Sequence, residues 1–365
     1  MTDSTHYFAR VRETLAQPPS MDTLGALLLM MEQWPDSEEL RLAKEYVDTH
    51  LTDWPETLQE LYRWNEEATA ENWQKLQRLF DKAMDGGGQA LVAAFRSRLK
   101  DWPTELLRMS EPQPTHPCWG LVASFEAGTL SFEDDSGYSP SSFFRAPLQD
   151  LNLKSTNPEN ADIQQFLEIV DLSELRSLNL ESNLLSDEGL SMFLGALGDG
   201  SLEELWLGWN EISAEGLRQI VEEAGLRNLK RLQFENNEIV GPEVGILAGA
   251  PYLKQVDFLE LYNNDMMNSG IKALVDNFDL PNVRVLYLDN NQFTDEGALH
   301  IANSPAFSQL KELHLDRNAI GEEGALALLE SEHLKGLETI RLSSNDDISE
   351  STIARLEKDS RFDFL

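Results

Sequence analysis

A period of 27 residues runs through the second part of the chain. Apolar residues recur there in the pattern Leu-x-x-Leu-x-Leu-x-x-Asn, which is first complete at Leu175, Leu178, Leu180 and Asn183. Further copies begin at Leu202, Leu229, Val256, Val283, Leu310 and Leu337, and an earlier one at Leu148 has Thr156 at the asparagine position. Eight units on one unbroken period predict a stacked solenoid, because so short a unit buries its apolar face only against its neighbours.

Each unit contains a strand signal followed by a helix signal. The alternating leucines predict a short strand with one buried face, and stacked units would place these strands side by side in parallel. The asparagine marks the turn after the strand, where its side chain can satisfy backbone groups. Apolar residues at helical spacing follow, so the return segment is predicted to be helical. In five units this helix is preceded by a glycine: Gly189, Gly216, Gly270, Gly297 and Gly324.

This consensus resembles the ribonuclease-inhibitor-like type of leucine-rich repeat over residues 148–365. The resemblance implies an α/β solenoid with parallel strands on the concave face and helices on the convex face. It also implies protein binding, since the family contains inhibitors, GTPase activators, immune sensors and ubiquitin-ligase adaptors. Two departures are visible: Pro242 and Glu243 replace the glycine signal of the third complete unit, and the last unit has an extra residue near Asp346. Both are expected to change the local turn without breaking the stack.

Residues 1–112 predict an all-helical N-terminal domain that resembles no recognised family. The expected helices are 5–16, 21–33, 37–51, 56–67, 71–84 and 88–100. Three Trp-Pro pairs precede helical patterns, where proline suits the first turn, and Asp36 and Asp53 have the spacing of N-terminal caps. The tryptophans are expected to pack in the core, with ligand binding as the alternative. The glycine tract 86–88 is expected to be a turn, because it lacks the Gly-Lys-Ser/Thr of a phosphate-binding loop.

A solenoid needs a cap at each end, because its terminal units would otherwise expose apolar faces. Residues 113–147 predict a linker and a β-hairpin with arms at 121–125 and 130–132, which would cap the first unit. At the other end, Phe362 and Phe364 predict an edge strand that closes the last unit.

The chain is strongly acidic, with 64 acids against 29 bases and a net charge of −35. Residues 148–365 carry −24 of this charge and residues 1–147 carry −11. Phosphate backbones and anionic membrane surfaces would be repelled, so nucleic-acid and membrane binding are not expected. A basic protein is the natural complement. The alternative is that the acids only keep the protein soluble.

Signals for chemistry are weak. Cys118 is the single cysteine, which excludes an internal disulfide and fits a reducing, cytoplasmic location. No apolar run is long enough for a membrane helix, and the first residues lack a signal-peptide pattern. The histidines have no zinc spacing and no calcium-loop motif occurs, so neither metal nor cofactor is predicted. The protein is therefore predicted not to be an enzyme, and a catalytic Cys118 remains only as an alternative.

The period also identifies the side chains on the concave side of the strands. Aromatic and acidic residues gather among them, a composition typical of binding hot spots with electrostatic steering. The predicted partner-binding residues are Trp206, Trp209, Tyr262, Tyr287, Glu181, Glu235, Glu260, Asp289, Asp316 and His314. The alternative is that Trp206 and Trp209 only pack on each other or under the N-terminal domain.

The predicted function is a protein–protein interaction module, an inhibitor, adaptor or sensor, that binds a basic protein on this concave face. One alternative is a two-domain scaffold in which the helical domain recruits a second protein. The other is an enzyme that uses Cys118.

Overall fold

The computed structural model describes residues 4–83, 88–109, 117–127, 145–345 and 347–364, which form two compact units. The first unit comprises Met1–Glu126, Asp134–Leu148 and Glu168–Asp171, as far as these ranges are described. The second comprises Ala127–Glu133, Gln149–Leu167 and Leu172–Leu365 on the same condition.

The first unit is mainly helical. Five of the six predicted helices are present with ends shifted by at most one residue, and the fourth ends at Tyr62, five residues before its predicted end. Their bounds are α1 (Ser4–Leu15), α2 (Met21–Glu32), α3 (Glu38–His50), α4 (Glu56–Tyr62), α5 (Ala70–Ala83) and α6 (Gln89–Leu99).

Close packing explains several small and aromatic residues of this unit. A Cβ on Gly25 of α2 would clash with the backbone of Leu91 in α6, so the two helices approach as only glycine allows. The predicted core role of the tryptophans is confirmed where they are buried, at Trp34, Trp54, Trp64 and Trp73.

The two predicted helix caps are wrong. Ser37, one residue after Asp36, caps α3 by accepting a hydrogen bond from the Leu40 amide. Asp53 lies in the 3-10 turn η1 (Leu51–Asp53), and α4 begins after Pro55 without a side-chain cap. Capping-box spacing alone did not distinguish these competing local turns.

Four short strands also belong to the first unit. They pair in parallel as β1 (Arg108–Met109) with β2 (Ser124–Glu126), and β3 (Ala146–Pro147) with β5 (Val170–Asp171). The first predicted hairpin arm overlaps β2 at residues 124–125, and the parallel pairing of β2 with β1 was not predicted. The second arm, 130–132, lies outside the described residues.

The second unit contains a parallel sheet in which each repeat supplies one strand. Equivalent leucines face each other at the predicted spacing, as Leu151 does Leu178 and Leu205 does Leu232. At the C-terminal end Phe362 pairs with Ile340, which confirms the predicted edge strand. The strands are β4 (Asp150–Asn152), β6 (Ser177–Asn179), β7 (Glu204–Trp206), β8 (Arg231–Gln233), β9 (Phe258–Glu260), β10 (Val285–Tyr287), β11 (Glu312–His314), β12 (Thr339–Arg341) and β13 (Phe362–Asp363).

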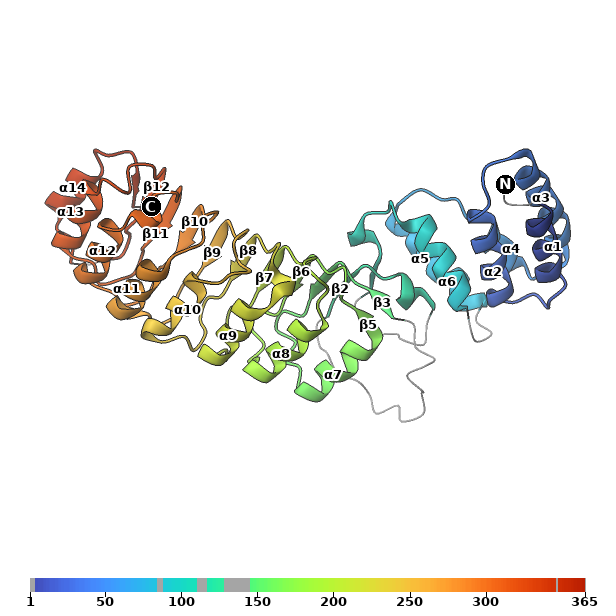
Figure 1. The fold of residues 1–365 in the computed structure, drawn as a ribbon, viewed down its shortest axis with the longest axis horizontal. Coiled ribbons are helices and arrows are strands. Elements are labelled where there is room, and N and C mark those ends of the chain that lie inside the picture. Colours follow the sequence, from blue (N-terminus) through green and yellow to red (C-terminus); the bar gives the residue numbers. More distant parts are fainter. Residues whose placement is uncertain (1–3, 84–87, 110–116, 128–144, 346, 365) are drawn as a thin grey trace. The chain divides into compact units, whose positions relative to one another are not determined.

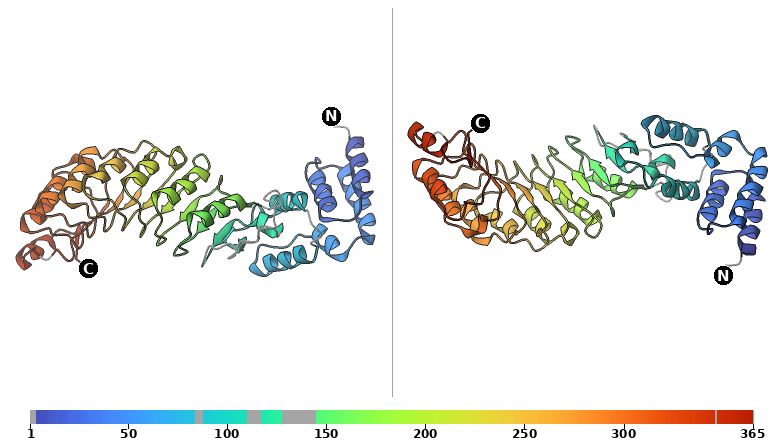
Figure 2. Two further views of the ribbon diagram at one scale, coloured as in Figure 1. Left: turned by 90° about the horizontal axis from the view of Figure 1, so that it is seen from below. Right: turned by 90° about the horizontal axis from the view of Figure 1, so that it is seen from above.

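The helices of the second unit lie on the opposite side from the strands (Figures 1 and 2). At Pro242 the turn changes as expected: η6 (Gly241–Val244) and the short α10 (Gly245–Ala248) replace a full helix, while Leu232 and Leu259 keep their register. The helices are α7 (Asn160–Ile169), α8 (Asp187–Ala196), α9 (Ala214–Glu222), α10 (Gly245–Ala248), α11 (Met267–Asn277), α12 (Asp295–Ala302), α13 (Glu322–Glu330) and α14 (Glu350–Leu356).

Buried asparagines connect the coils as the sequence predicts. Asn264 donates to the carbonyl of Phe234 in the preceding coil at 2.9 Å, and its Oδ1 accepts from the Asn237 amide at 3.1 Å. Equivalent bonds recur at the other repeat asparagines, for example from Asn210 to the Leu180 carbonyl. The core leucines and this ladder together hold the strands in fixed register, which makes the exposed strand side a rigid surface.

Candidate partner-binding site

Three positions of each repeat place side chains on the strand side, and we call this surface the strand face. The first position lies between the two inner leucines, the second directly after the second leucine, and the third one residue later. The first contains Asn152, Asn179, Trp206, Gln233, Glu260, Tyr287, His314 and Arg341. The second contains Lys154, Glu181, Gly208, Glu235, Tyr262, Asp289, Asp316 and Ser343. The third contains Ser155, Ser182, Trp209, Asn236, Asn263, Asn290, Arg317 and Ser344.

The third position has a left-handed backbone in every repeat. Its φ lies between 50° and 60° from Ser155 to Ser344, a region that suits serine and asparagine better than bulky residues. Trp209 and Arg317 nevertheless occupy it, and both are exposed. Backbone bonds on the next coil hold them there, since the Trp209 amide donates to the Glu235 carbonyl and the Arg317 amide to the Ser343 carbonyl.

Trp206, the last residue of β7, and Trp209, three residues later, are the two tryptophans of the strand face. Trp206 is half-buried and Trp209 is 49% exposed. Neither indole makes a ring contact or a side-chain hydrogen bond with another described residue, so the two rings do not stack on each other. Gly208 lies between them and leaves the second strand-face position of this coil without a side chain.

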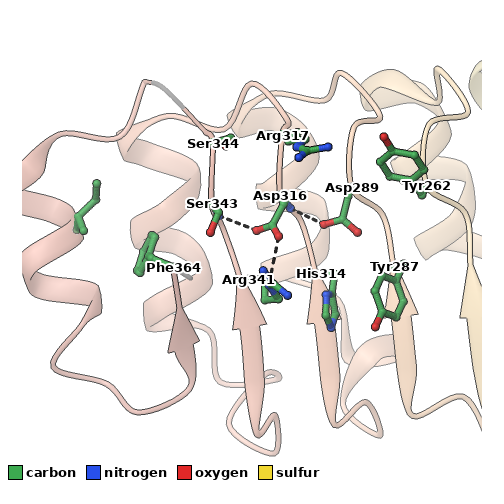
Figure 3. A pocket seen from close by; sticks show the side chains of 11 residues that line it. Tyr262, Tyr287, Asp289, His314, Asp316, Arg317, Arg341, Ser343, Ser344 and Phe364 are labelled. Carbon is green, nitrogen blue, oxygen red and sulfur yellow. Dashed lines mark hydrogen bonds and ion pairs between the residues drawn. The ribbon is translucent and has the colours of Figure 1, made fainter.

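A hollow with a volume of about 680 Å³ lies at the C-terminal end of the strand face (Figure 3). It brings together five of the predicted site residues, Tyr262, Tyr287, Asp289, His314 and Asp316. Trp206 and Trp209 are not among its lining residues. They belong to the coil of β7, two strand spacings or about 10 Å from the coil of Tyr262, which lines the hollow. The hollow therefore contains only part of the predicted site.

His314 forms part of the floor of this hollow. It is only 6% exposed and stacks on Tyr287, with 3.9 Å between ring centroids. Its Nε2 makes no hydrogen bond to a described residue, although Glu312 Oε2 lies 3.6 Å away. Burial lowers the pKa of His314, and the positive charge of Arg341 lowers it further. Both effects favour the neutral imidazole.

Asp289 and Asp316 link successive coils as well as line the hollow. Asp289 Oδ1 accepts a hydrogen bond from the Asp316 amide at 2.8 Å, and Asp316 Oδ1 accepts one from the Ser343 amide at 2.6 Å. Asp316 Oδ2 also lies 3.2 Å from Arg341 Nε. Burial raises the pKa of Asp289 to about 6, and repulsion from Asp316 adds to this. These acids are thus partly satisfied within the repeat array.

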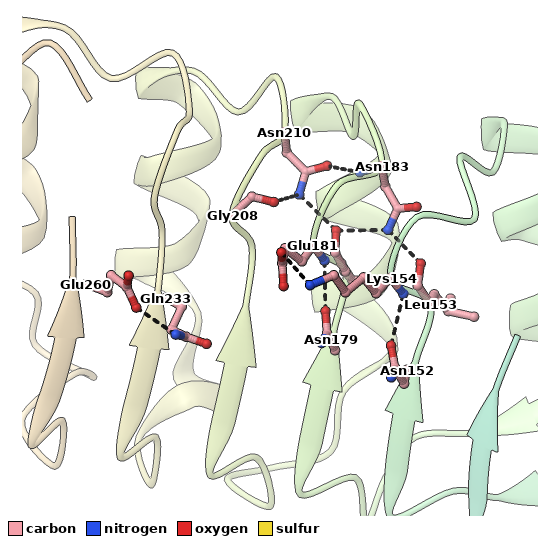
Figure 4. A network of polar contacts seen from close by, with 11 residues as sticks. Asn152, Leu153, Lys154, Asn179, Glu181, Asn183, Gly208, Asn210, Gln233 and Glu260 are labelled. Atoms are coloured by element: carbon pink, nitrogen blue, oxygen red, sulfur yellow. Dashed lines mark hydrogen bonds and ion pairs between the residues drawn. The ribbon is translucent and has the colours of Figure 1, made fainter. Parts of the chain in front are cut away.

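The remaining acids of the predicted site differ in their partners. Glu181 pairs with Lys154 at 2.7 Å, and Glu260 accepts a hydrogen bond from Gln233 at 2.6 Å (Figure 4). Glu235 instead has a buried Oε2 without a hydrogen-bond partner. Burial raises the pKa of Glu235 to about 7, and the negative charges of Glu260 and Glu181 act in the same direction.

Sequence reasoning did not single out Arg317, Arg341 and Phe364 as part of the hollow. The period placed Arg317 at the position of Trp209, which was the available signal. Phe364 reaches the hollow because β13 pairs only 22 residues after β12, outside the 27-residue period.

The described residues form no site for the alternative chemistry at Cys118. Cys118 lies in the 3-10 segment η3 (Pro117–Leu121), its side chain is not described, and His116 is outside the described residues. Within the described ranges, no group of three or more His, Cys, Asp or Glu side chains could hold a metal ion. No described helix is long and apolar enough to cross a membrane.

Comparison with known proteins bears on the family. A model described as leucine-rich repeat matches residues 171–194, 201–221, 279–302 and 309–329, and no curated protein matches the chain. Among solved structures, the chain is similar to one in the Rad7 and Elc1 complex in yeast, with 13% identity over 86% of this chain and 92% of that chain and a TM-score of 0.47. An internalin (inlF) from Listeria monocytogenes has 19% identity over 75% and 94%, with a TM-score of 0.37.

A third similar structure is the ectodomain of the receptor kinase GASSHO1/SCHENGEN3 from Arabidopsis thaliana, with 19% identity and a TM-score of 0.33. The match covers 66% of this chain and 25% of the receptor chain. The repeat pattern, the parallel strands that it forms and the four family-model matches agree, and the chain is a leucine-rich-repeat protein.

Proposed function

We propose that this protein is an interaction module, an inhibitor, adaptor or sensor, that binds a basic protein on the strand face. The observation that carries the proposal is Trp209, a large aromatic side chain that is 49% exposed on a rigid array. Exposed tryptophan and tyrosine commonly supply the anchors of protein interfaces.

The surroundings of Trp209 favour a cationic partner. Glu181, Glu235 and Glu260 lie on the same face, and the repeat half carries most of the net charge of −35. Such a field accelerates association with basic surfaces and disfavours acidic ones. A cytoplasmic location, suggested by the single cysteine, belongs to the same proposal.

The length of the strand face suits a protein surface. Trp206 on β7 and His314 on β11 are four strand spacings apart, which corresponds to roughly 20 Å at the usual spacing. Two anchor regions at this separation, the tryptophans and the hollow, would engage a folded surface or an extended segment of the partner.

Affinity purification from the native cell tests the proposal with three full-length forms. These are the wild type, Trp206→Ala/Trp209→Ala, and the control Tyr252→Ala, which removes an exposed aromatic residue outside the strand face. A partner retained by wild type and control should be lost by the double variant, and the purified complex should weaken by at least about 30-fold, or about 2 kcal/mol. Unchanged affinity of the double variant would remove the assignment.

A further inference from the structure

The strand face contains one carboxylate whose charge is not balanced by the fold. The carboxyl of Glu235 has a hydrogen bond from its own backbone amide, but no other described side chain donates to it or pairs with it, and its Oε2 is buried without a partner. Glu181 and Asp289 occupy the same strand-face position two coils before and two coils after Glu235. They have partners at 2.7 and 2.8 Å. A buried charge normally has a counter-charge or a hydrogen-bond donor, so Glu235 lacks a group that a ligand could supply.

Gly208 determines where this carboxylate lies. A Cβ at Gly208 would clash with the carboxyl oxygens of Glu235, so the carboxyl occupies the space that the missing side chain leaves. Side chains two positions apart in a strand point the same way, which places this space beside Trp206. Trp209 follows directly and is exposed. We call the group of Trp206, Gly208, Trp209 and Glu235 the Glu235 notch.

We infer that the Glu235 notch binds one arginine side chain of the basic partner. This inference rests on the proposed function and names the chemistry of one anchor. The carboxyl of Glu235 can accept an N–H bond from a guanidinium group, which also brings an opposite charge to it. The flanking indoles offer faces on which the planar guanidinium can stack, which a lysine ammonium uses less well.

Charge on neighbouring coils supports a cation at this place. Glu260 and Glu181 lie on either side of Glu235 and raise its pKa through repulsion, so an added cation would relieve unfavourable interactions with all three acids. Lys154 is the one base among the groups that act on Glu235, and its ammonium is paired with Glu181 at 2.7 Å.

The test uses the full-length protein with 15N-labelled indoles and three peptides that differ only in one central residue, arginine, lysine or citrulline. Citrulline keeps the shape of arginine without its charge. The arginine peptide should shift the indole signals of Trp206 and Trp209, which are identified with single Trp→Phe variants. The lysine peptide should bind at least fivefold more weakly, and the citrulline peptide should leave both signals unchanged.

Two charge-removing variants separate the notch from the general acidity of the chain. Glu235→Gln should weaken the arginine peptide at least tenfold, whereas Glu238→Gln, at an exposed position three residues later, should change its affinity less than twofold. Circular dichroism spectra of the two variants establish that both are folded. Equal binding of the lysine peptide, or equal effects of the two variants, would overturn the inference.

The outcome is distinguishable from a failure of the proposed function. If the notch is wrong but the strand face is right, the native partner is still lost with Trp206→Ala/Trp209→Ala and retained with Glu235→Gln. If the strand face itself is wrong, the native partner is retained by the double tryptophan variant.

Discussion

Trp209 and Arg317 occupy the same position of two coils, four repeat periods apart, and both have a left-handed backbone with φ of 57° and 55°. Serine or asparagine stands at this position in the other coils. A bulky residue in this conformation costs of the order of 1 kcal/mol and persists only where the surrounding hydrogen bonds hold it. The fold thus tolerates two residues that disfavour this backbone conformation, both on the strand face that we propose to bind protein.

Arg317→Asn should therefore stabilise the protein by about 1 kcal/mol, because asparagine adopts this backbone readily and the exposed guanidinium has no ion pair with another described residue. Urea unfolding followed by circular dichroism measures the change. Trp209 is less suitable for this test, because about half of its large side-chain surface is still covered and its removal also loses apolar burial.

The matched control for Arg317→Asn is Asn290→Arg at the equivalent position of the preceding coil. It introduces the same backbone cost and removes the hydrogen bond from Asn290 to Asn263, so it should lower stability. If Arg317→Asn were less stable than the wild type, the Arg317 side chain would stabilise the fold by more than its left-handed backbone costs.

Asn264→Ala should destabilise the repeat array by about 2–4 kcal/mol. The side chain is 2% exposed, and its loss leaves the Phe234 carbonyl and the Asn237 amide without their partners inside the stack. Asn303→Ala serves as the control, since Asn303 is exposed and its side chain bonds only within its own helix end. Similar unfolding midpoints for the two variants would contradict a structural role of the asparagine ladder.

The sequence was informative where a period fixes geometry. The spacing of the leucines and of the repeat asparagines determines the strand register and the face on which each side chain lies. The register and faces predicted from this spacing agree with the structure. A sequence period cannot show where on the strand face the end of a side chain lies. The carboxyl of Glu235 lies over Gly208 of the neighbouring coil, and Asp289 bonds to the backbone of the next one, because local space and free amides are available there.

The 27-residue period did not predict the hollow either. It depends on the stacking of His314 on Tyr287 and on the return of the chain at Phe364, which follows a shorter spacing than the repeats. The predicted site residues are consequently divided between the hollow and the tryptophans, although the sequence pattern had treated them as one surface.

Glu235→Gln should stabilise the protein at pH 8 and have little effect near pH 5. The pKa of Glu235 is raised to about 7 by burial, so the folded chain binds more protons than the unfolded chain between its ordinary value and pH 7. Stability then falls as pH rises through this window, and a neutral glutamine removes that loss. Thermal unfolding at the two pH values, with Glu238→Gln as the control, measures it. An equal increase in stability at both pH values would contradict the claim that burial destabilises the charged form of Glu235.

Gly208→Ala should abolish binding of an arginine peptide while the protein stays folded. The new Cβ would displace the carboxyl of Glu235, which is the flexible end of its side chain, and the Gly208 backbone does not have a positive φ that would strain alanine. The displaced carboxyl becomes hydrated, so its pKa should fall toward the ordinary value, and the increase in stability of Glu235→Gln at pH 8 should shrink in the Gly208→Ala background. Gly195→Ala is the control, because a Cβ there meets open space. Peptide affinity that survives Gly208→Ala would mean that the cation binds elsewhere on the acidic face.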